Sequence, residues 1–444
     1  MKLIPDADDL MQRAFWLLPA LMVAGGIVAG LVIPRIDAGV AWEFVDRPES
    51  ARAILSTIAT GTVSVAGVTF SIIVVALTLA SSQLSPRVMR TFRSRKLNQV
   101  VLGMFVATFA YSLLVLRTVG GTDDGTYVPD ISVVFAVVLA IVAFGLFIAF
   151  IGQIVHALEA STIIERIALE ARPGVDSPYP AGCAEPPDDP VGARRRVARR
   201  TAGPSFEVRA RSAGFLSSVD GSTVVEAAAE HDALIAQETP LGDYVVTGDL
   251  LARMWCEHPA VEALELCVRA AFGVGRERTP LQDLGFSVRQ LADVALRGVS
   301  PSTNDPTTAE NAMNALGETL TRIARQEPPA RIRVDSEGVE RFVACTPDLG
   351  ELVRLGFDQV RVKAGSYPVL CVRLLELLHK IDAATADGCA ECARQARLIR
   401  RTVAASGVID EDVATVEDAA MRLFGGGQPP GDEAAAPAAS RERR

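Results

Sequence analysis

The sequence predicts an α-helical integral membrane protein with four transmembrane helices, followed by a cytoplasmic α+β domain. Three observations predict this class. Four long apolar stretches without Asp, Glu, Lys or Arg lie in the first third of the chain, and a strongly basic loop separates the second from the third. After residue 156 the composition becomes acidic, with 33 Lys and Arg against 43 Asp and Glu. A purely soluble enzyme is therefore excluded.

The four apolar stretches define a transmembrane domain over residues 1–156. A spanning helix needs roughly 17 to 25 predominantly apolar residues, and each stretch reaches that length. An ionisable side chain inside a span usually marks a proton relay or a substrate site, and these spans contain none. The predicted spans are about 14–34, 54–80, 100–116 and 131–154.

The loops between the spans predict the orientation. The loop after the second span holds Arg87, Arg90, Arg93, Arg95 and Lys96 without any acid, whereas the other two loops mix fewer basic residues with Asp and Glu. Because basic loops remain on the cytoplasmic side, we expect a multi-pass protein of the bacterial inner membrane with both termini in the cytoplasm.

The rest of the chain divides into three segments. We expect a juxtamembrane helix to about Ala171 and then a linker within residues 157–204, the α+β domain over 205–424, and a disordered low-complexity tail over 425–444. The linker carries five arginines, which suit a solvated or headgroup-facing patch. They are Arg194, Arg195, Arg196, Arg199 and Arg200.

Local patterns predict the elements of the α+β domain. Alternation indicates a strand over 205–211, an Ala-rich run indicates a helix over 224–230, and Gly242 and Gly248 suggest a hairpin. A strand pair is expected at 331–334 and 341–344. Helical periodicity occurs over 281–299, 307–324, 349–362 and 369–381.

Several motifs resemble a bacterial family of predicted membrane proteins of unknown function (domain of unknown function 2254). The resemblance rests on segments that cover nearly all the chain up to about residue 400, and it implies four spans plus a cytoplasmic domain but no activity. The segments are Ala80-Ser-Ser-Gln-Leu-Ser-Pro-Arg, Asn98-Gln-Val-Val-Leu-Gly-Met-Phe, Gly275-Arg-Glu-Arg-Thr-Pro-Leu-Gln-Asp, Arg289-Gln-Leu-Ala-Asp and Ser300-Pro-Ser-Thr-Asn-Asp-Pro-Thr-Thr-Ala.

Hydroxyl side chains form a stripe along the second span. At about 100° per residue, six of them fall within about 60° of one line along the helix. They are Thr57, Thr60, Ser64, Ser71, Thr78 and Ser82. Hydroxyls at this depth must face protein or water, so the stripe suits either helix packing or the lining of a pore. Ser56, Thr62, Thr69 and Ser81 lie off the line.

The basic loop follows this stripe directly. In a symmetric assembly Arg87, Arg90 and Arg93 would form basic rings at the cytoplasmic mouth of a pore. The positive-inside rule and lipid headgroups explain the same charges without a pore.

A second group of residues suggests a ligand or assembly site in the α+β domain. Thr279-Pro280-Leu281-Gln282 is typical of a helix start with a capping box, and Asp305-Pro306 of another. Hydroxyls near Ser300 and nearby guanidinium groups would suit a small anion if they converge. The candidates are Arg276, Arg278, Asp283, Arg289, Asp293, Arg297, Ser300, Asn304 and Asp305.

No catalytic, metal or cofactor site is expected. The seven cysteines lie in the second half without the spacing of a disulfide framework. Cys389-Ala-Glu-Cys392 fits a reduced helical pair better than a zinc site, which needs four ligands. The acidic second half gives no basic face for nucleic acid. Membrane lipid, further copies of the chain and a small ion or anion are the expected partners.

Together these patterns predict a homo-oligomeric membrane protein. We interpret it as an ion channel whose second span lines the pore and whose cytoplasmic domain assembles or gates it. The alternatives are a membrane-tethered sensor of a small anionic ligand and, with less support, a secondary transporter, because transporters commonly carry ionisable residues inside their spans.

Overall fold

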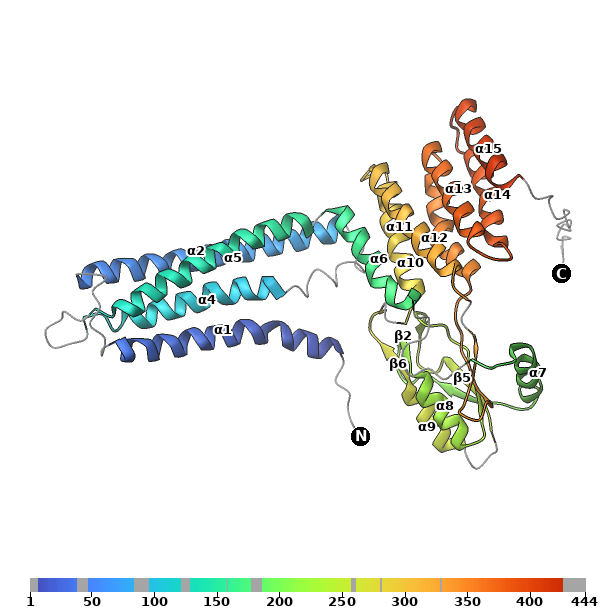
Figure 1. Ribbon diagram of the computed structural model, residues 1–444, viewed down its shortest axis with the longest axis horizontal. Coiled ribbons are helices and arrows are strands. Elements are labelled where there is room, and N and C mark those ends of the chain that lie inside the picture. Colours follow the sequence, from blue (N-terminus) through green and yellow to red (C-terminus); the bar gives the residue numbers. More distant parts are fainter. Residues whose placement is uncertain are drawn as a thin grey trace, which may run out of the picture. The chain divides into compact units, whose positions relative to one another are not determined.

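The computed structural model divides the chain into two compact units, Met1–Ile163 and Ile164–Arg444. We call them the four-helix unit and the α+β unit and describe each by itself. Figure 1 shows the elements of both. The structure describes residues 7–37, 47–83, 96–120, 128–157, 159–176, 186–256, 261–279, 282–327 and 330–425.

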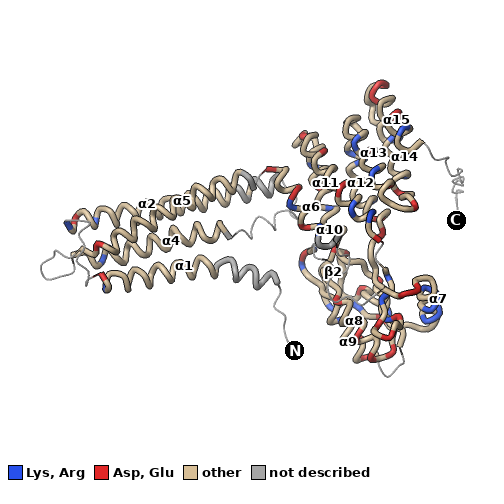
Figure 2. Tube along the Cα trace, viewed as in Figure 1, with Lys and Arg blue, Asp and Glu red and all other residues tan. Residues whose placement is uncertain are grey.

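Four long helices build the first unit, and each is long and apolar enough to cross a membrane. Figure 2 shows that their described parts are almost free of charged residues. Four N-terminal apolar helices followed by a mixed α/β region confirm the predicted fold class. The helices are α1 (Ala7–Asp37), α2 (Pro48–Gln83), α4 (Lys96–Leu116) and α5 (Asp130–Ala157).

Helix α4 is the centre of the four-helix unit. It contacts α1, α2 and α5. In its apolar membrane-spanning segment 50% of the residues are buried, compared with 17% in each of the other three helices. Phe105 and Tyr111 of α4 are fully buried. The faces of α1, α2 and α5 that point away from α4 are therefore left for lipid or another protein.

Glycines let α1 and α4 approach each other closely. A Cβ atom on Gly26 would lie 2.7 Å from the backbone oxygen of Ala107, and one on Gly103 would lie 3.0 Å from the Cα of Pro19. Small residues at such contacts bring membrane helices together without side-chain obstruction.

A polar contact joins the C-terminal end of α1 to the start of α5. The Asp37 carboxylate accepts the backbone N–H groups of Ile131 and Ser132 at 3.3 and 3.0 Å, and the Ser132 hydroxyl at 3.0 Å. The Tyr111 hydroxyl donates to the Ser132 carbonyl at 3.0 Å. Asp37 thus satisfies backbone donors that the helix start leaves unpaired.

The α+β unit contains two sheets. Strands β1-β5-β3-β8-β7 form the larger one, in which β3 and β8 are parallel and the other pairs antiparallel. Strands β4-β2-β6 form the smaller, antiparallel one. The strands are β1 (Phe206–Arg209), β2 (Gly214–Val219), β3 (Leu234–Gln237), β4 (Tyr244–Val245), β5 (Leu250–Trp255), β6 (Phe272–Gly275), β7 (Ile332–Val334) and β8 (Glu340–Val343).

One hydrophobic core joins both sheets to α8 (Gly221–Glu230) and α9 (Val261–Ala271). Leu216 of β2, Ile235 of β3 and Leu264 of α9 are fully buried in it. The remaining helices pack mainly on one another, α10 on α11 and α12, α12 on α14, and α13 on α11, α14 and α15. They are α10 (Leu284–Gly298), α11 (Pro306–Ala324), α12 (Leu349–Ala364), α13 (Pro368–Ala383), α14 (Ala390–Ala404) and α15 (Asp410–Phe424).

Two local predictions for this unit are wrong. The expected hairpin does not form, because β4 pairs with β2 whereas β5 pairs with β1 and β3, although Gly242 and Gly248 do adopt positive φ. The capping box at Thr279 does not form either. Helix α10 starts at Leu284 with Asp283 as its cap, and the Gln282 side chain instead bonds to the backbone of Val219.

Other predictions for this unit are confirmed. The strand pair is β7 and β8, and the four predicted helices correspond to α10, α11, α12 and α13. The strand at 205–211 and the Ala-rich helix correspond to β1 and α8.

The segment before β1 is more helical than expected. Helix α6 (Ala160–Asp176) contains the boundary between the units and continues past Arg172, where the linker was predicted to begin. Asp189 then caps α7 (Pro190–Arg200), accepting the N–H of Gly192 at 2.9 Å. The predicted tail beyond residue 425 lies outside the described residues.

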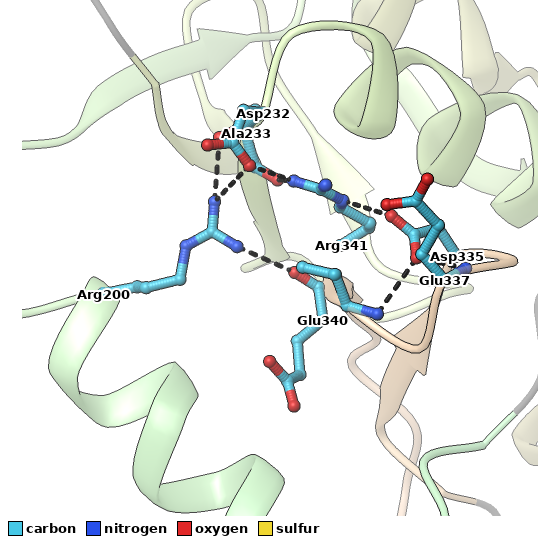
Figure 3. A network of polar contacts seen from close by, with 8 residues as sticks. Arg200, Asp232, Ala233, Asp335, Glu337, Glu340 and Arg341 are labelled. Atoms are coloured by element: carbon cyan, nitrogen blue, oxygen red, sulfur yellow. Dashed lines mark hydrogen bonds and ion pairs between the residues drawn. The ribbon is translucent and has the colours of Figure 1, made fainter.

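Two of the five linker arginines bind the larger sheet rather than facing only solvent or headgroups. Arg196 bonds to the Glu340 carboxylate at 2.7 Å. Arg200 donates to the carbonyls of Glu340 and Asp232 at 3.1 and 2.8 Å. Figure 3 shows Arg200 beside a second guanidinium, that of Arg341.

Arg341 is the centre of an ion-pair network in which it and Asp335 are buried whereas the Asp232 side chain is 87% exposed. Its guanidinium contacts Asp335 at 2.7 Å and Asp232 at 2.6 Å (Figure 3). The side chains of Arg341 and Asp335 are 8% and 9% exposed. The network ties α7, the start of β3 and the β7–β8 turn together.

Candidate functional site

The hydroxyl stripe of α2 lies on the outer surface of the four-helix unit. Thr57, Thr60, Ser64, Ser71 and Thr78 are all exposed. Of the off-stripe residues, Thr62 and Thr69 are 1% and 0% exposed, whereas Ser56 is exposed. Packing against the other three helices of the same chain therefore does not explain the stripe. Ser82 lies in α2, but its side chain is outside the described residues.

The exposed hydroxyls donate their protons back to their own helix. Thr57, Ser64, Ser71 and Thr78 bond to the carbonyl four residues earlier, at 2.7, 2.9, 3.0 and 2.8 Å. Each hydroxyl oxygen then presents lone pairs outward. These bonds lower the cost of contact with lipid, and the free lone pairs also suit water or an ion.

The same surface of α2 forms a seam of small residues with heptad spacing. From Ala53 to Ser71 the small residues are spaced alternately four and three residues apart. The next one, Thr78, follows seven residues after Ser71. The seam consists of Ala53, Thr57, Thr60, Ser64, Gly67, Ser71 and Thr78. A Cβ atom on Gly67 would meet nothing within 4 Å. A seam with period 3.5 suits a second helix at a shallow crossing angle.

An open apolar groove lies beside this seam, between α2 and α5. Thr57 and Ile58 line it from α2, and Ile141, Phe144 and Gly145 line it from α5. The exposed surface of the four-helix unit is therefore hollowed beside Thr57. The basic residues Arg87, Arg90 and Arg93, predicted to follow the other end, lie outside the described residues.

In the α+β unit, Asp283 and Arg278 form a buried pair at the start of α10. The two side chains are 2.7 Å apart and 5% and 18% exposed. Burial raises the pKa of Asp283 above its usual range, and Arg278 opposes that shift. Asp283 also accepts the Phe286 N–H at 3.0 Å, so the pair caps a helix. Arg276 is exposed.

Ser300, Asn304 and Asp305 lie at the opposite end of α10. The Ser300 hydroxyl donates to the Arg297 carbonyl at 2.8 Å. Asn304, with φ of 45°, accepts the Tyr367 hydroxyl at 3.0 Å. Asp305 caps α11 by accepting the Thr308 N–H at 3.0 Å, as predicted.

The structure does not bring these two groups together. Arg276 and Arg278 precede α10 and Ser300 follows it, and a helix of 15 residues is about 22 Å long. Arg289 and Asp293 form an ion pair of 3.9 Å along α10 between them. A rigid helix therefore keeps Arg276 and Arg278 away from Ser300, whereas Arg297, in the last turn of α10, lies at the same end as Ser300.

Ser300 instead lines a groove with basic residues that the sequence interpretation did not select. Arg361 and Lys363 of α12 and Arg394 of α14 contribute to it. Two of these cations already have partners, Arg361 with Gln395 and Thr402, and Arg394 with Glu391. A signal was available in the basic residues near the end of the predicted helix 349–362. Among the described residues, no group of three His, Cys, Asp or Glu could hold a metal ion.

Asp305→Ala is expected to lower the free energy of unfolding of the α+β unit by about 1 kcal/mol at pH 7. Bonds from the Thr308 hydroxyl and N–H hold the pKa of Asp305 below its usual 3.8. A depressed pKa stabilises the fold above the unfolded pKa, and the gain disappears as the pH falls through the folded pKa. The gap between wild type and variant should thus close below about pH 4.

Chemical denaturation of the full chain at several pH values checks this expectation. Asp305→Asn is the matched control, because Asn caps helices about as well as Asp. A gap that persists unchanged at low pH would show that the carboxylate is not the stabilising group.

Comparison with known proteins identifies the family. A family model described as "Predicted membrane protein (DUF2254)" matches residues 12–380. The chain belongs to this family. This member is thus a multi-pass membrane protein with four candidate spans, in agreement with the resemblance of its motifs.

Relatives of this DUF2254 protein occur in mycobacteria. Uncharacterized proteins of Mycobacterium bovis and of two Mycobacterium tuberculosis strains are each 32% identical to it over 434 residues. The match covers 94% of this chain and 80% of each relative. No solved structure matches the chain.

Proposed function

We propose that the protein assembles into a symmetric homo-oligomer in which α2 lines a path for small ions. In this proposal the chain lies in a bacterial inner membrane with both termini in the cytoplasm. The α+β unit assembles or gates the path from the cytoplasmic side, without a catalytic role. The exposed hydroxyl stripe of α2 carries the proposal.

The stripe supports assembly because its small residues repeat with a period that suits helix pairing. Copies of α2 arranged around a symmetry axis would place equivalent hydroxyls in rings. Each copy would contribute one hydroxyl oxygen to each ring, and the rings would lie at the levels of Thr57, Ser64, Ser71 and Thr78. Rings of oxygen atoms can replace part of the hydration shell of an ion.

The charge distribution agrees with such a path. No Asp, Glu, Lys or Arg interrupts α2 between Arg52 and Gln83, so an ion would meet no fixed charge within the span. The basic loop after α2 would lie at the cytoplasmic mouth and influence which ions enter.

The two alternatives have less support. The sensor has less support because Arg278 pairs with Asp283 and Arg361 and Arg394 beside Ser300 are already engaged. This leaves Arg297 and Lys363 as the cations for an anion at that groove. The transporter would be expected to carry an ionisable group within its spans, whereas the buried Asp37 and Asp130 lie at helix ends.

Single-channel recording of the purified full chain in planar bilayers tests the proposal. We expect discrete conductance steps, together with an oligomer of defined size in detergent. Reversal potentials in salt gradients then give the selectivity. A monomer that produces no conductance under any tested salt or voltage contradicts the proposal.

A further inference from the structure

Two cysteines meet at the start of α14, in the α+β unit. Cys389 is the residue before the first helical turn, and Cys392 is the third residue of α14. Both thiols are free and buried, Cys389 at 8% and Cys392 at 0% exposure. This pair is the Cys-x-x-Cys motif of the sequence, and it has no part in the proposed ion path.

The surrounding backbone holds the pair in one arrangement. The Cys389 N–H donates to the Asp382 carboxylate at 2.6 Å, which ties the end of α13 to the start of α14. Gly388, with φ of 71°, makes the turn between them. Residues three apart at a helix start lie on one face, so the Cys392 side chain lies beside that of Cys389.

These contacts make the two thiols unequal. Hydrogen bonding from the Cys392 thiol, with help from the backbone N–H groups, lowers the pKa of Cys389 to about 6, against the opposing effects of burial and Asp382. Its bond to Cys389, burial and the nearby Asp382 and Glu391 all raise the pKa of Cys392. Cys389 is thus the more acidic thiol of the pair.

Other cysteines in the same unit lack this arrangement. Burial raises the pKa of Cys371 to about 12 and also raises that of Cys256. Cys267 is exposed on α9. Because the thiolate is the reactive form, Cys389 should differ in chemistry from all three.

We propose that Cys389 and Cys392 are a redox-active dithiol that exchanges with low-molecular-weight disulfides. The Cys389 thiolate attacks one sulfur of the disulfide, forms a mixed disulfide and releases one thiolate. Cys392 then gives its proton to the released thiolate and attacks the Cys389 sulfur. The second thiolate leaves, so two protein thiols are oxidised and one disulfide is reduced to two thiols.

Mass spectrometry of the full chain after exposure to glutathione disulfide tests this step. Trypsin releases both cysteines in the single peptide Ile381–Arg394. We expect this peptide to lose the mass of two hydrogens, and dithiothreitol to restore it. The exposed Cys267 is the internal control, because without a neighbouring thiol it can only gain a glutathione adduct.

Two variants separate the roles of the thiols. Cys392→Ser should stop at a mixed disulfide with one glutathione on Cys389. Cys389→Ser should leave Cys392 unmodified, because that thiol is buried and protonated. An unchanged wild-type peptide under conditions that modify Cys267 would overturn the proposal, as would a glutathione adduct on Cys392 in Cys389→Ser. The wild-type result stands even if a variant does not fold.

Discussion

Ser64→Leu is expected to reduce ion flux through the protein by about tenfold or more. Ser64 lies near the middle of α2, is exposed, and presents its oxygen on the stripe. Leucine replaces that oxygen with a bulky apolar group in every copy, and a ring of such groups blocks a narrow path by excluding water. An added barrier of about 1.4 kcal/mol already reduces a rate tenfold. Flux into liposomes containing the purified protein measures the effect.

Two control variants test whether position and chemistry matter. Ser64→Thr keeps the hydroxyl and should retain flux. Val63→Leu adds apolar bulk at a neighbouring residue that is 47% exposed but lies off the stripe, and it should also retain flux. Native gels must show the wild-type oligomer for all three variants. If Ser64→Leu conducts like wild type, the stripe faces lipid or a packed helix rather than a pore.

Arg341→Ala should destabilise the α+β unit by about 3 to 5 kcal/mol. Removing the guanidinium leaves the carboxylate of Asp335, which is 9% exposed, without its cation. It also removes the 2.6 Å contact with Asp232. A buried charge that loses its partner costs several kcal/mol because it has already lost most of its hydration. Chemical denaturation followed by circular dichroism measures the loss.

Arg253→Ala is the matched control for that variant. Arg253 also bridges two acids, Glu238 at 3.2 Å and Glu207 at 3.8 Å, but its side chain is 39% exposed. Exposed pairs contribute up to about 1 kcal/mol. If Arg341→Ala changes stability no more than Arg253→Ala does, the backbone N–H groups of Glu337 and Val339 are sufficient to satisfy Asp335.

Local signals were sufficient for part of the α+β unit. Asp305 followed by Pro306 predicted the start of α11, because a cap and a first-turn proline act on neighbouring residues only. The same type of signal failed at Thr279, where Asp283 caps α10 instead and Gln282 bonds to β2. Competing caps a few residues apart are decided by contacts with a distant strand.

Strand pairing and site assembly required distant parts of the chain. The turn between Gly242 and Gly248 was recognisable, but β4 and β5 join different sheets. Ser300 was a candidate ligand residue and lines a groove, but Arg361 and Arg394, more than 60 residues later, complete that groove. Nothing in the spacing of these residues indicates that they meet.

The four apolar helices and the α+β character of the remainder follow from composition and local patterns alone. Lipid cannot satisfy exposed backbone groups, so long charge-free stretches must become helices wherever they occur. The sequence by itself also determined that α2 carries a line of hydroxyls, since helical periodicity is a local property.

The direction in which that line faces depends on tertiary packing. The sequence allowed it to pack against neighbouring helices, but Thr62 and Thr69 are buried whereas Thr57, Ser64 and Ser71 are exposed. The orientation of a helix about its axis depends on packing with distant segments, which here includes the close glycine contacts between α1 and α4.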